Sequence, residues 1–210
     1  MDYLSVIEML NACHGPSGDE RQIATTLKRL AEPYADTCHI DTLGNLIVHK
    51  KGPGPKVMFA AHMDSIGVVA TYIDEKGFIR FAQVGGLFKG DLINIQVRFA
   101  GGTRGVISYE EKTPFKDITL DNLFIDIGAA DRADAERQVQ IGDFAVFDAP
   151  RFEQNGVLCG PYLDNRIGCV TLLLVMERLA QQEIENDLYF AFTAQEEVGL
   201  RGAGAAAFAV

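Results

Sequence analysis

Two short apolar runs constrain the fold of this chain more than any other feature. Residues 57–61 read VMFAA and residues 187–194 read DLYFAFTA, and polar residues bound the second run on both sides. Short, nearly continuous apolar runs of this kind are typical of buried strands in the sheet of an α/β protein. The sequence therefore predicts an α/β sheet to which both ends of the chain contribute.

Segments with helix signals flank the two predicted strands. Residues 2–12 place apolar side chains on one helical face, and residues 167–180 form a strongly apolar helix. Ser17 is followed three residues later by Glu20, which is the spacing of a capping box, so a further helix is expected to start there.

The middle of the chain has a different texture. From about residue 65 to 148, short β-rich runs separated by glycines replace the alternation of helix and strand. This pattern predicts a small barrel or sandwich inserted into the α/β unit. The expected division is residues 1–65 for the first part of the α/β domain, 66–150 for the inserted β-rich domain and 151–210 for the second part of the α/β domain.

Composition excludes several classes of partner. The chain has 210 residues, of which 48% are hydrophobic, and a formal net charge of −10, whereas nucleic-acid binding needs a basic surface. No run approaches the roughly 20 apolar residues of a membrane span. The acidic N-terminus does not resemble a secretory signal. The four cysteines show no paired spacing and are expected to be reduced. A cytoplasmic protein without a membrane or nucleic-acid partner is expected.

Polar residues follow each predicted strand at its carboxyl end. His62 and Asp64 follow the first strand, and Glu196 and Glu197 follow the second. In open α/β sheets, ligands bind at this edge. Adjacent glutamates diverge, so one can hold a cation while the other moves protons. Alternation places His62 and Asp64 on the same side, where the carboxylate can fix the tautomer of a metal-binding imidazole. Taken singly, the glutamate pair also fits a solvated loop and the histidine also fits a structural role.

Asp164 stands at the start of the predicted helix that follows the β-rich segment. An acid at this position can cap the helix. Alternatively, its two oxygens can touch two different cations. Imidazole and carboxylate ligands without thiolates suit Zn²⁺, Co²⁺ or Mn²⁺. Two such ions a few ångströms apart can share a hydroxide and hold a carbonyl group for attack.

Three segments of the sequence resemble the signature segments of a known family. AHMDSIG, YLDNRIG and TAQEEVGLRGA are similar to those of the M42 family of dinuclear metalloaminopeptidases, and further similarity, including GPSGDE and IGDFAVFD, extends over the whole chain. The resemblance implies a zinc-peptidase-like catalytic domain with a mixed sheet, here incomplete, and an inserted small β-domain. It also implies peptide substrates and self-association, which in the family produces dodecamers.

The resemblance also implies a role for each candidate residue. His62 and Glu197 would bind metal, Asp164 would bridge two divalent ions of zinc, cobalt or manganese, and Asp64 would orient His62. Glu196 would be the general base that serves a metal-bridged hydroxide as it attacks the first peptide bond of a substrate.

The C-terminal part of the family pattern has no counterpart here. The family's remaining metal ligands, an aspartate beyond the QEE segment and a histidine near the C-terminus, have no matching position, so the chain is expected to be truncated. Two alternatives therefore stay open beside the aminopeptidase. One is an inactive truncated homologue that acts only as an oligomerising or binding fragment. The other is a related amidohydrolase or carboxypeptidase.

Overall fold

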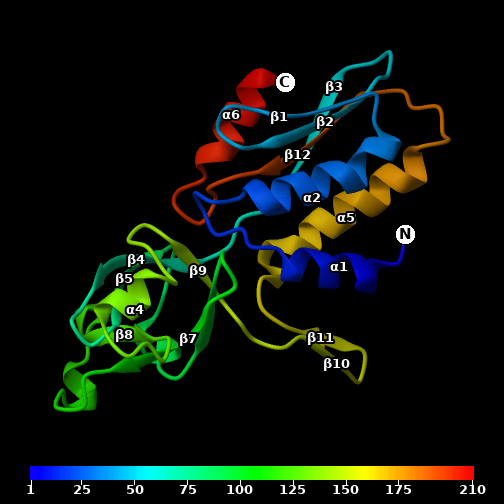
Figure 1. Ribbon diagram of the computed structural model, residues 1–210. Coiled ribbons are helices and arrows are strands. Elements are labelled where there is room, and N and C mark those ends of the chain that lie inside the picture. The colour runs from blue at the N-terminus through cyan, green and yellow to red at the C-terminus, as the bar shows by residue number, and fades with distance from the viewer. The chain divides into compact units, whose positions relative to one another are not determined.

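The chain folds into two compact units. The computed structural model describes residues 1–210. The first unit, here called the sheet unit, joins Met1–Ser65 to Tyr162–Val210, and the second, the barrel unit, is Ile66–Pro161. In Figure 1 the sheet unit takes the blue-to-cyan and the gold-to-red parts of the chain, whereas the barrel unit is mostly green. None of the helices combines the length and the apolar character that a membrane span requires.

The sheet unit contains a four-stranded mixed sheet. Its strands are β1 (Thr37–Ile40), β2 (Leu46–Lys50), β3 (Lys56–His62) and β12 (Asp187–Thr193). The strand order is β1-β2-β12-β3, with β12 antiparallel to β2 and parallel to β3. Both predicted apolar strands are therefore present, and they are neighbours although more than a hundred residues separate them in sequence.

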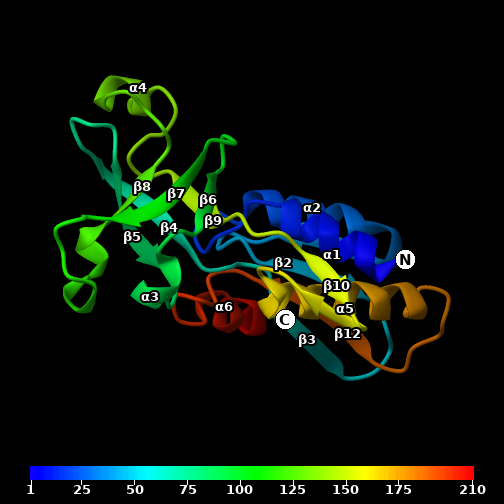
Figure 2. The same ribbon diagram turned by 90° about the horizontal axis from the view of Figure 1, so that it is seen from below.

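Helices cover both faces of this sheet. They are α1 (Tyr3–Ala12), α2 (Arg21–Ala31), the short 3-10 helix η1 (Glu32–Tyr34), α5 (Leu163–Leu179) and α6 (Arg201–Ala209). Figures 1 and 2 show α1, α2 and α5 together on one side and α6 on the other. Side chains that alternate along the strands account for this arrangement, since Ile47 and Ala191 pack against Ala206 of α6.

The barrel unit is a closed six-stranded barrel with strand order β4-β5-β8-β7-β6-β9. Its strands are β4 (Gly67–Ile73), β5 (Ile79–Val84), β6 (Gln96–Phe99), β7 (Arg104–Tyr109), β8 (Leu123–Asp126) and β9 (Phe144–Phe147). Its helices are α3 (Lys89–Leu92), η2 (Phe115–Asp117), η3 (Leu120–Asn122) and α4 (Arg132–Glu136). Alternate side chains such as Ile79 and Phe81 of β5 point into one apolar core, which closes the inserted domain as a barrel rather than a sandwich.

Residues 151–161 belong to the barrel unit, whereas the sequence placed them with the second part of the α/β domain. They contain a hairpin of β10 (Phe152–Gln154) and β11 (Val157–Cys159), whose strands pair only with each other. Asn155 and Gly156 both have positive φ, as a two-residue hairpin turn requires. The hairpin adds no strand to the mixed sheet or to the barrel, and the compact units divide after Pro161.

The predicted capping box is wrong. Helix α2 begins at Arg21, and its N-cap residue Glu20 makes no side-chain capping bond. The Ser17 hydroxyl donates instead to Asp64 at 2.6 Å, and the Glu20 carboxylate accepts from the Gly18 amide at 2.9 Å. Contacts with residues outside the first turn of α2 have taken over both side chains.

Candidate metal centre

The candidate site lies where β3 and β12 end side by side. The two strands are parallel, and His62 is the register partner of Thr193. The pairing continues one residue further, because the Met63 amide donates to the Thr193 carbonyl at 2.9 Å. The residues that follow both strands therefore emerge at the same edge of the sheet.

Three of the predicted residues form a cluster at this edge. His62, Glu196 and Glu197 each offer one ligand atom, and these atoms all lie within 4.8 Å of one another. The His62 Nε2 atom is 3.7 Å from Glu196 Oε2. His62 is buried, whereas the two glutamates are partly exposed. One imidazole nitrogen and two carboxylates thus face a common point that solvent can reach.

Asp164 lies next to this cluster. Its Oδ1 atom is 3.1 Å from His62 Nε2, and its side chain is 89% exposed. It does not belong to the group of mutually close ligand atoms around His62. The alternative of a helix-capping aspartate loses support, because the adjacent Asn165 makes the capping bond: its side-chain oxygen accepts from the Gly168 amide at 3.1 Å.

Helix α5 is held closely against the end of β3. A Cβ atom added at Gly168 would lie 3.1 Å from the Cβ of Ala61. The Cys169 thiol donates to the His62 carbonyl at 3.3 Å. Burial raises the pKa of this thiol to about 12, and its bond to the His62 carbonyl supports the strand end. These contacts bring Asp164 to His62 across 102 residues of sequence.

Asp64 does more than face the imidazole. It is fully buried, and its carboxylate accepts the Glu196 amide at 3.1 Å, the Glu197 amide at 3.2 Å and the Ser17 hydroxyl at 2.6 Å. Its Oδ1 atom lies 3.6 Å from His62 Nδ1, whereas the backbone carbonyl of Asp64 is nearer, at 3.2 Å. Asp64 therefore fixes the backbone that carries both glutamates as well as one side of the imidazole.

The charges of the site favour a cation. Burial alone would lower the pKa of His62, but hydrogen bonding to Asp64 and the nearby Asp164 and Glu196 outweigh it and raise that pKa to about 9. Burial raises the pKa of Glu197, and the neighbouring carboxylates act in the same direction. The pKa of Asp64 is lowered, because hydrogen bonds to its carboxylate outweigh the effect of burial. A cation bound at His62 would replace its second ring proton and relieve the repulsion between the carboxylates.

The donor set fits a divalent transition-metal ion. An imidazole nitrogen and carboxylate oxygens without a thiolate are ligands for Zn²⁺, Co²⁺ or Mn²⁺. Of the residues predicted from the sequence, His62, Glu196 and Glu197 lie close together, and Asp164 contacts His62. Their division into ligands and base stays a prediction.

Two residues of this site were missed from the sequence. Ser17 bonds to Asp64, and the Glu20 carboxylate accepts the Gln195 amide at 3.1 Å. The spacing of Ser17 and Glu20 predicted a helix cap instead. No local sequence pattern predicts a hydrogen bond between residues that lie 175 positions apart, as Glu20 and Gln195 do.

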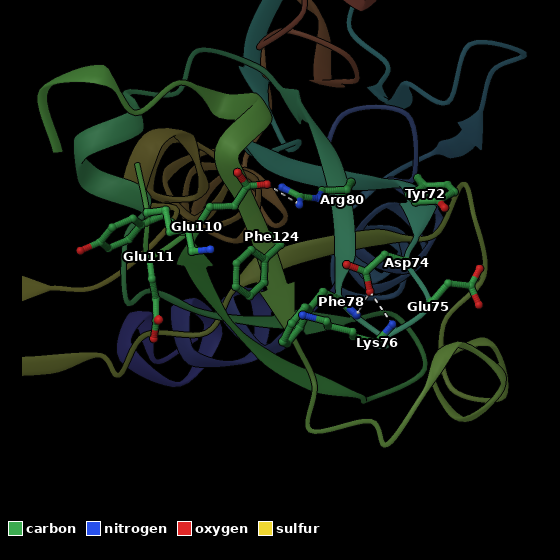
Figure 3. Close-up of a pocket in the computed structure, with 11 residues that line it drawn as sticks. Tyr72, Asp74, Glu75, Lys76, Phe78, Arg80, Glu110, Glu111 and Phe124 are labelled. Carbon is green, nitrogen blue, oxygen red and sulfur yellow. Dashed lines mark hydrogen bonds and ion pairs between the residues drawn. The ribbon is translucent and has the colours of Figure 1, made fainter. Parts of the chain in front are cut away.

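The barrel unit contains a separate cavity of about 710 Å³ (Figure 3). Aromatic side chains, among them Tyr72, Phe78 and Phe124, contribute to its lining. Two of the charged groups drawn there are engaged with each other, since Arg80 forms an ion pair with Glu110 at 2.7 Å. The cavity contains no histidine or cysteine and none of the predicted site residues, so the candidate chemistry lies at the strand ends.

Comparison with known proteins agrees with this site. The family model described as M42 glutamyl aminopeptidase matches residues 44–210, which include every candidate ligand. The chain belongs to the M42 family. The suspected family is thereby confirmed, and with it the fold of a mixed-sheet domain with an inserted barrel.

Individual M42 relatives match nearly the whole chain but are longer. A protein of Acetivibrio thermocellus described as a candidate aminopeptidase is 43% identical over 100% of this chain and 63% of its own length. The structure of an aminopeptidase from Desulfurococcus kamchatkensis matches with a TM-score of 0.93 and 34% identity, over 99% of this chain and 60% of that one.

The description of a third relative mentions assembly into larger particles. A peptidase from Pyrococcus horikoshii, described as able to assemble into a tetrahedron or a large octahedral shell, matches with a TM-score of 0.89 and 34% identity. The match covers 96% of this chain and 64% of that one. The chain thus spans about three fifths of the length of these M42 proteins.

Proposed function

We propose that this chain carries the metal-binding core of an M42 aminopeptidase, which hydrolyses the N-terminal residue from peptides with two divalent ions of zinc, cobalt or manganese. The observation that carries the proposal is the group of His62, Glu196 and Glu197 within 4.8 Å, with Asp164 3.1 Å from the same imidazole. The names of the relatives as aminopeptidases support the reaction class.

The ligand roles proposed here are those that the family resemblance implies, and the positions of the side chains support them. His62 and Glu197 would each bind an ion, and the exposed carboxylate of Asp164, beside His62 Nε2, would bridge the two. Asp64 would hold the imidazole from its other side and keep both glutamate amides in place.

Glu196 would act as the general base. The Lewis acidity that bound divalent ions supply lowers the pKa of a water molecule and polarises the scissile carbonyl group. Glu196 lies beside the ligands without an ion pair to any lysine or arginine, with its carboxylate 3.7 Å from His62 and partly open to solvent. It would take a proton from the attacking water and return it to the departing amine.

The test is to exchange Glu196 for glutamine in the chain loaded with Zn²⁺ or Co²⁺. Glu196→Gln keeps the size of the side chain and removes the base, so peptide hydrolysis should fall by about 10²–10⁴-fold. Zinc affinity, measured by calorimetry, should change much less. Glu183→Gln, an exposed glutamate outside the cluster, is the matched control. Equal activity of Glu196→Gln and wild type would remove Glu196 from the mechanism.

Blocking the substrate tests the reaction class. An aminopeptidase should release the first residue of a free peptide and fail on the same peptide with an acetylated N-terminus. A related amidohydrolase or carboxypeptidase should accept the blocked peptide, and that result would replace the aminopeptidase.

Self-association is the corresponding proposal for partners. It is supported by the shells described for the relative from Pyrococcus horikoshii. The cytoplasm is the proposed compartment, and the four free cysteines suit its reducing conditions. Sedimentation of the purified chain tests assembly, and a strictly monomeric boundary at micromolar concentration would contradict it.

A further inference from the structure

Three successive backbone amides lead into the tandem glutamates, and carboxylates from distant segments hold all of them. The Gln195 amide donates to Glu20 Oε1 at 3.1 Å. The next two amides, of Glu196 and Glu197, donate to the two oxygens of Asp64 at 3.1 and 3.2 Å. Two buried acids therefore determine the course of the backbone from which both glutamate side chains project.

Gln195 is the residue at which this backbone changes direction. Its φ is +57°, in the left-handed region that residues other than glycine rarely occupy. The residue before it, Ala194, is fixed by the hydrogen bond that its backbone amide donates to Asn45 Oδ1 at 2.9 Å. Such a conformation persists only when the surrounding structure holds it. At Gln195 the hydrogen bond to Glu20 is the contact that holds the amide.

Glu20 is itself anchored. It is 6% exposed, and the same Oε1 atom accepts the Gly18 amide at 2.9 Å. The loop before it is attached to the segment after β3 that carries Asp64, because the Ser17 amide donates to the Ser65 carbonyl at 3.1 Å and the Ser65 amide donates to the Gly15 carbonyl at 3.0 Å. Glu20 thus contacts the turn from a fixed position.

A buried carboxylate costs free energy unless hydrogen bonds compensate for its lost hydration. Glu20 satisfies one oxygen with two backbone amides, which are charge-assisted bonds and stronger than neutral ones. A helix cap needs no such burial, and Glu20 does not cap α2. The placement is explained by what the carboxylate holds, namely the first amide of the turn.

We propose that Glu20 is a positioning residue of the metal centre: by fixing Gln195 in its left-handed conformation, it aims the side chains of Glu196 and Glu197 at a shared cation. The inference rests on the proposed function, since it assigns Glu20 to the support of that same site. Outer residues that orient metal ligands typically change metal affinity by about 10–100-fold when mutated.

The experiment compares Glu20→Ala, Glu20→Gln and wild type in the full chain. Zinc affinity is measured by calorimetry, and hydrogen exchange of the peptide covering residues 193–199 is measured on the metal-free chain. Glu20→Ala should weaken zinc binding by about 10–100-fold and speed exchange in that peptide. Glu20→Gln keeps the accepting oxygen and should restore most of both properties.

A matched control separates positioning from general destabilisation. Leu27→Val removes one methylene from a fully buried side chain of α2, the helix that Glu20 precedes. It should lower the melting temperature without changing zinc affinity or exchange at residues 193–199. If Leu27→Val weakens zinc binding as much as Glu20→Ala does, Glu20 is merely structural and the inference is overturned.

The remaining outcomes distinguish the two proposals. Wild-type affinity and exchange in Glu20→Ala would overturn the role of Glu20 and leave the metal centre intact. A wild-type chain that binds no zinc, cobalt or manganese would overturn the proposed function and the metal-positioning role together. Faster exchange at residues 193–199 in Glu20→Ala would then still show that Glu20 holds the turn.

Discussion

Two glycines of helix α6 allow a sharp test of how the turn after β12 is fixed. Gly202 and Gly204 lie two residues apart in the same helix, but their surroundings differ. A Cβ atom added at Gly202 would lie 2.2 Å from Asn45 Oδ1 and 2.3 Å from the Ala194 carbonyl oxygen. A Cβ atom added at Gly204 would have no neighbour within 4 Å. The same change to alanine should therefore have opposite effects at the two positions.

The magnitude for Gly202→Ala follows from what must move. Overpacking against buried groups costs about 1–3 kcal/mol. The Asn45 side chain bonds to the Gly202 carbonyl at 3.1 Å and to the Ala194 amide at 2.9 Å, and each disturbed bond adds about 1 kcal/mol. The higher helix propensity of alanine over glycine offsets at most about 1 kcal/mol of this loss in stability. The free energy of unfolding should fall by about 2–4 kcal/mol, whereas Gly204→Ala should raise it by up to about 1 kcal/mol.

Urea unfolding followed by far-ultraviolet circular dichroism measures the difference. For a slope near 2 kcal/mol per molar urea, the Gly202→Ala midpoint should fall by about 1–2 M and the Gly204→Ala midpoint should stay or rise. The Gly202 amide also donates to the Ala194 carbonyl at 3.0 Å, next to the turn that leads to Glu196 and Glu197. Zinc affinity should therefore fall in Gly202→Ala together with stability. Equal midpoints for the two variants would refute the claim that this close approach fixes the turn.

Three further outcomes are expected. Ser17→Ala removes a buried bond to a carboxylate, so the free energy of unfolding should fall by about 1.5–3 kcal/mol in urea titrations, and an unchanged midpoint would contradict the bond to Asp64. The hydrogen bond from His49 lowers the pKa of Asp187 in the folded chain, so this contribution to stability is present above about pH 4 and is lost as the pH falls through the lowered folded value. Asp187→Asn should be less stable than wild type at pH 6, with the gap closing toward pH 3 in acid titrations, and a gap that does not depend on pH would argue against the pair. Zinc at 100 times its dissociation constant should stabilise the chain by about 2.7 kcal/mol over an EDTA-treated sample in thermal melts, and no shift would argue against the metal centre.

The sequence was sufficient for the parts of the site that follow buried strands. VMFAA and DLYFAFTA form β3 and β12, and their parallel pairing brings His62 beside Glu196 and Glu197. The link is physical, because side chains that leave neighbouring parallel strands at their carboxyl ends must share one edge. The inserted β-rich unit was equally predictable from short β-rich runs separated by glycines, although these left a barrel and a sandwich open.

The sequence failed where a local pattern and a distant partner compete for the same side chain. Ser17 and Glu20 have the spacing of a capping box, but their partners are Asp64 and Gln195. The capping rule describes only neighbours along the chain, and it is silent about which loop will lie across the site. The end of the inserted unit was missed by eleven residues for a similar reason, because a hairpin that pairs only with itself has no periodicity that assigns it to either neighbour.

The strand order β1-β2-β12-β3 has a consequence for how the protein is made. On a ribosome, β2 and β3 emerge early, but the strand that lies between them is β12, so they cannot close the sheet together. Until residues 187–193 have been synthesised, both strands keep an unpaired backbone edge of the kind that favours aggregation. The barrel, whose strands all lie within residues 66–161, is complete before that point. The nascent chain should therefore fold its inserted domain first and assemble the candidate metal centre only when β12 enters the sheet.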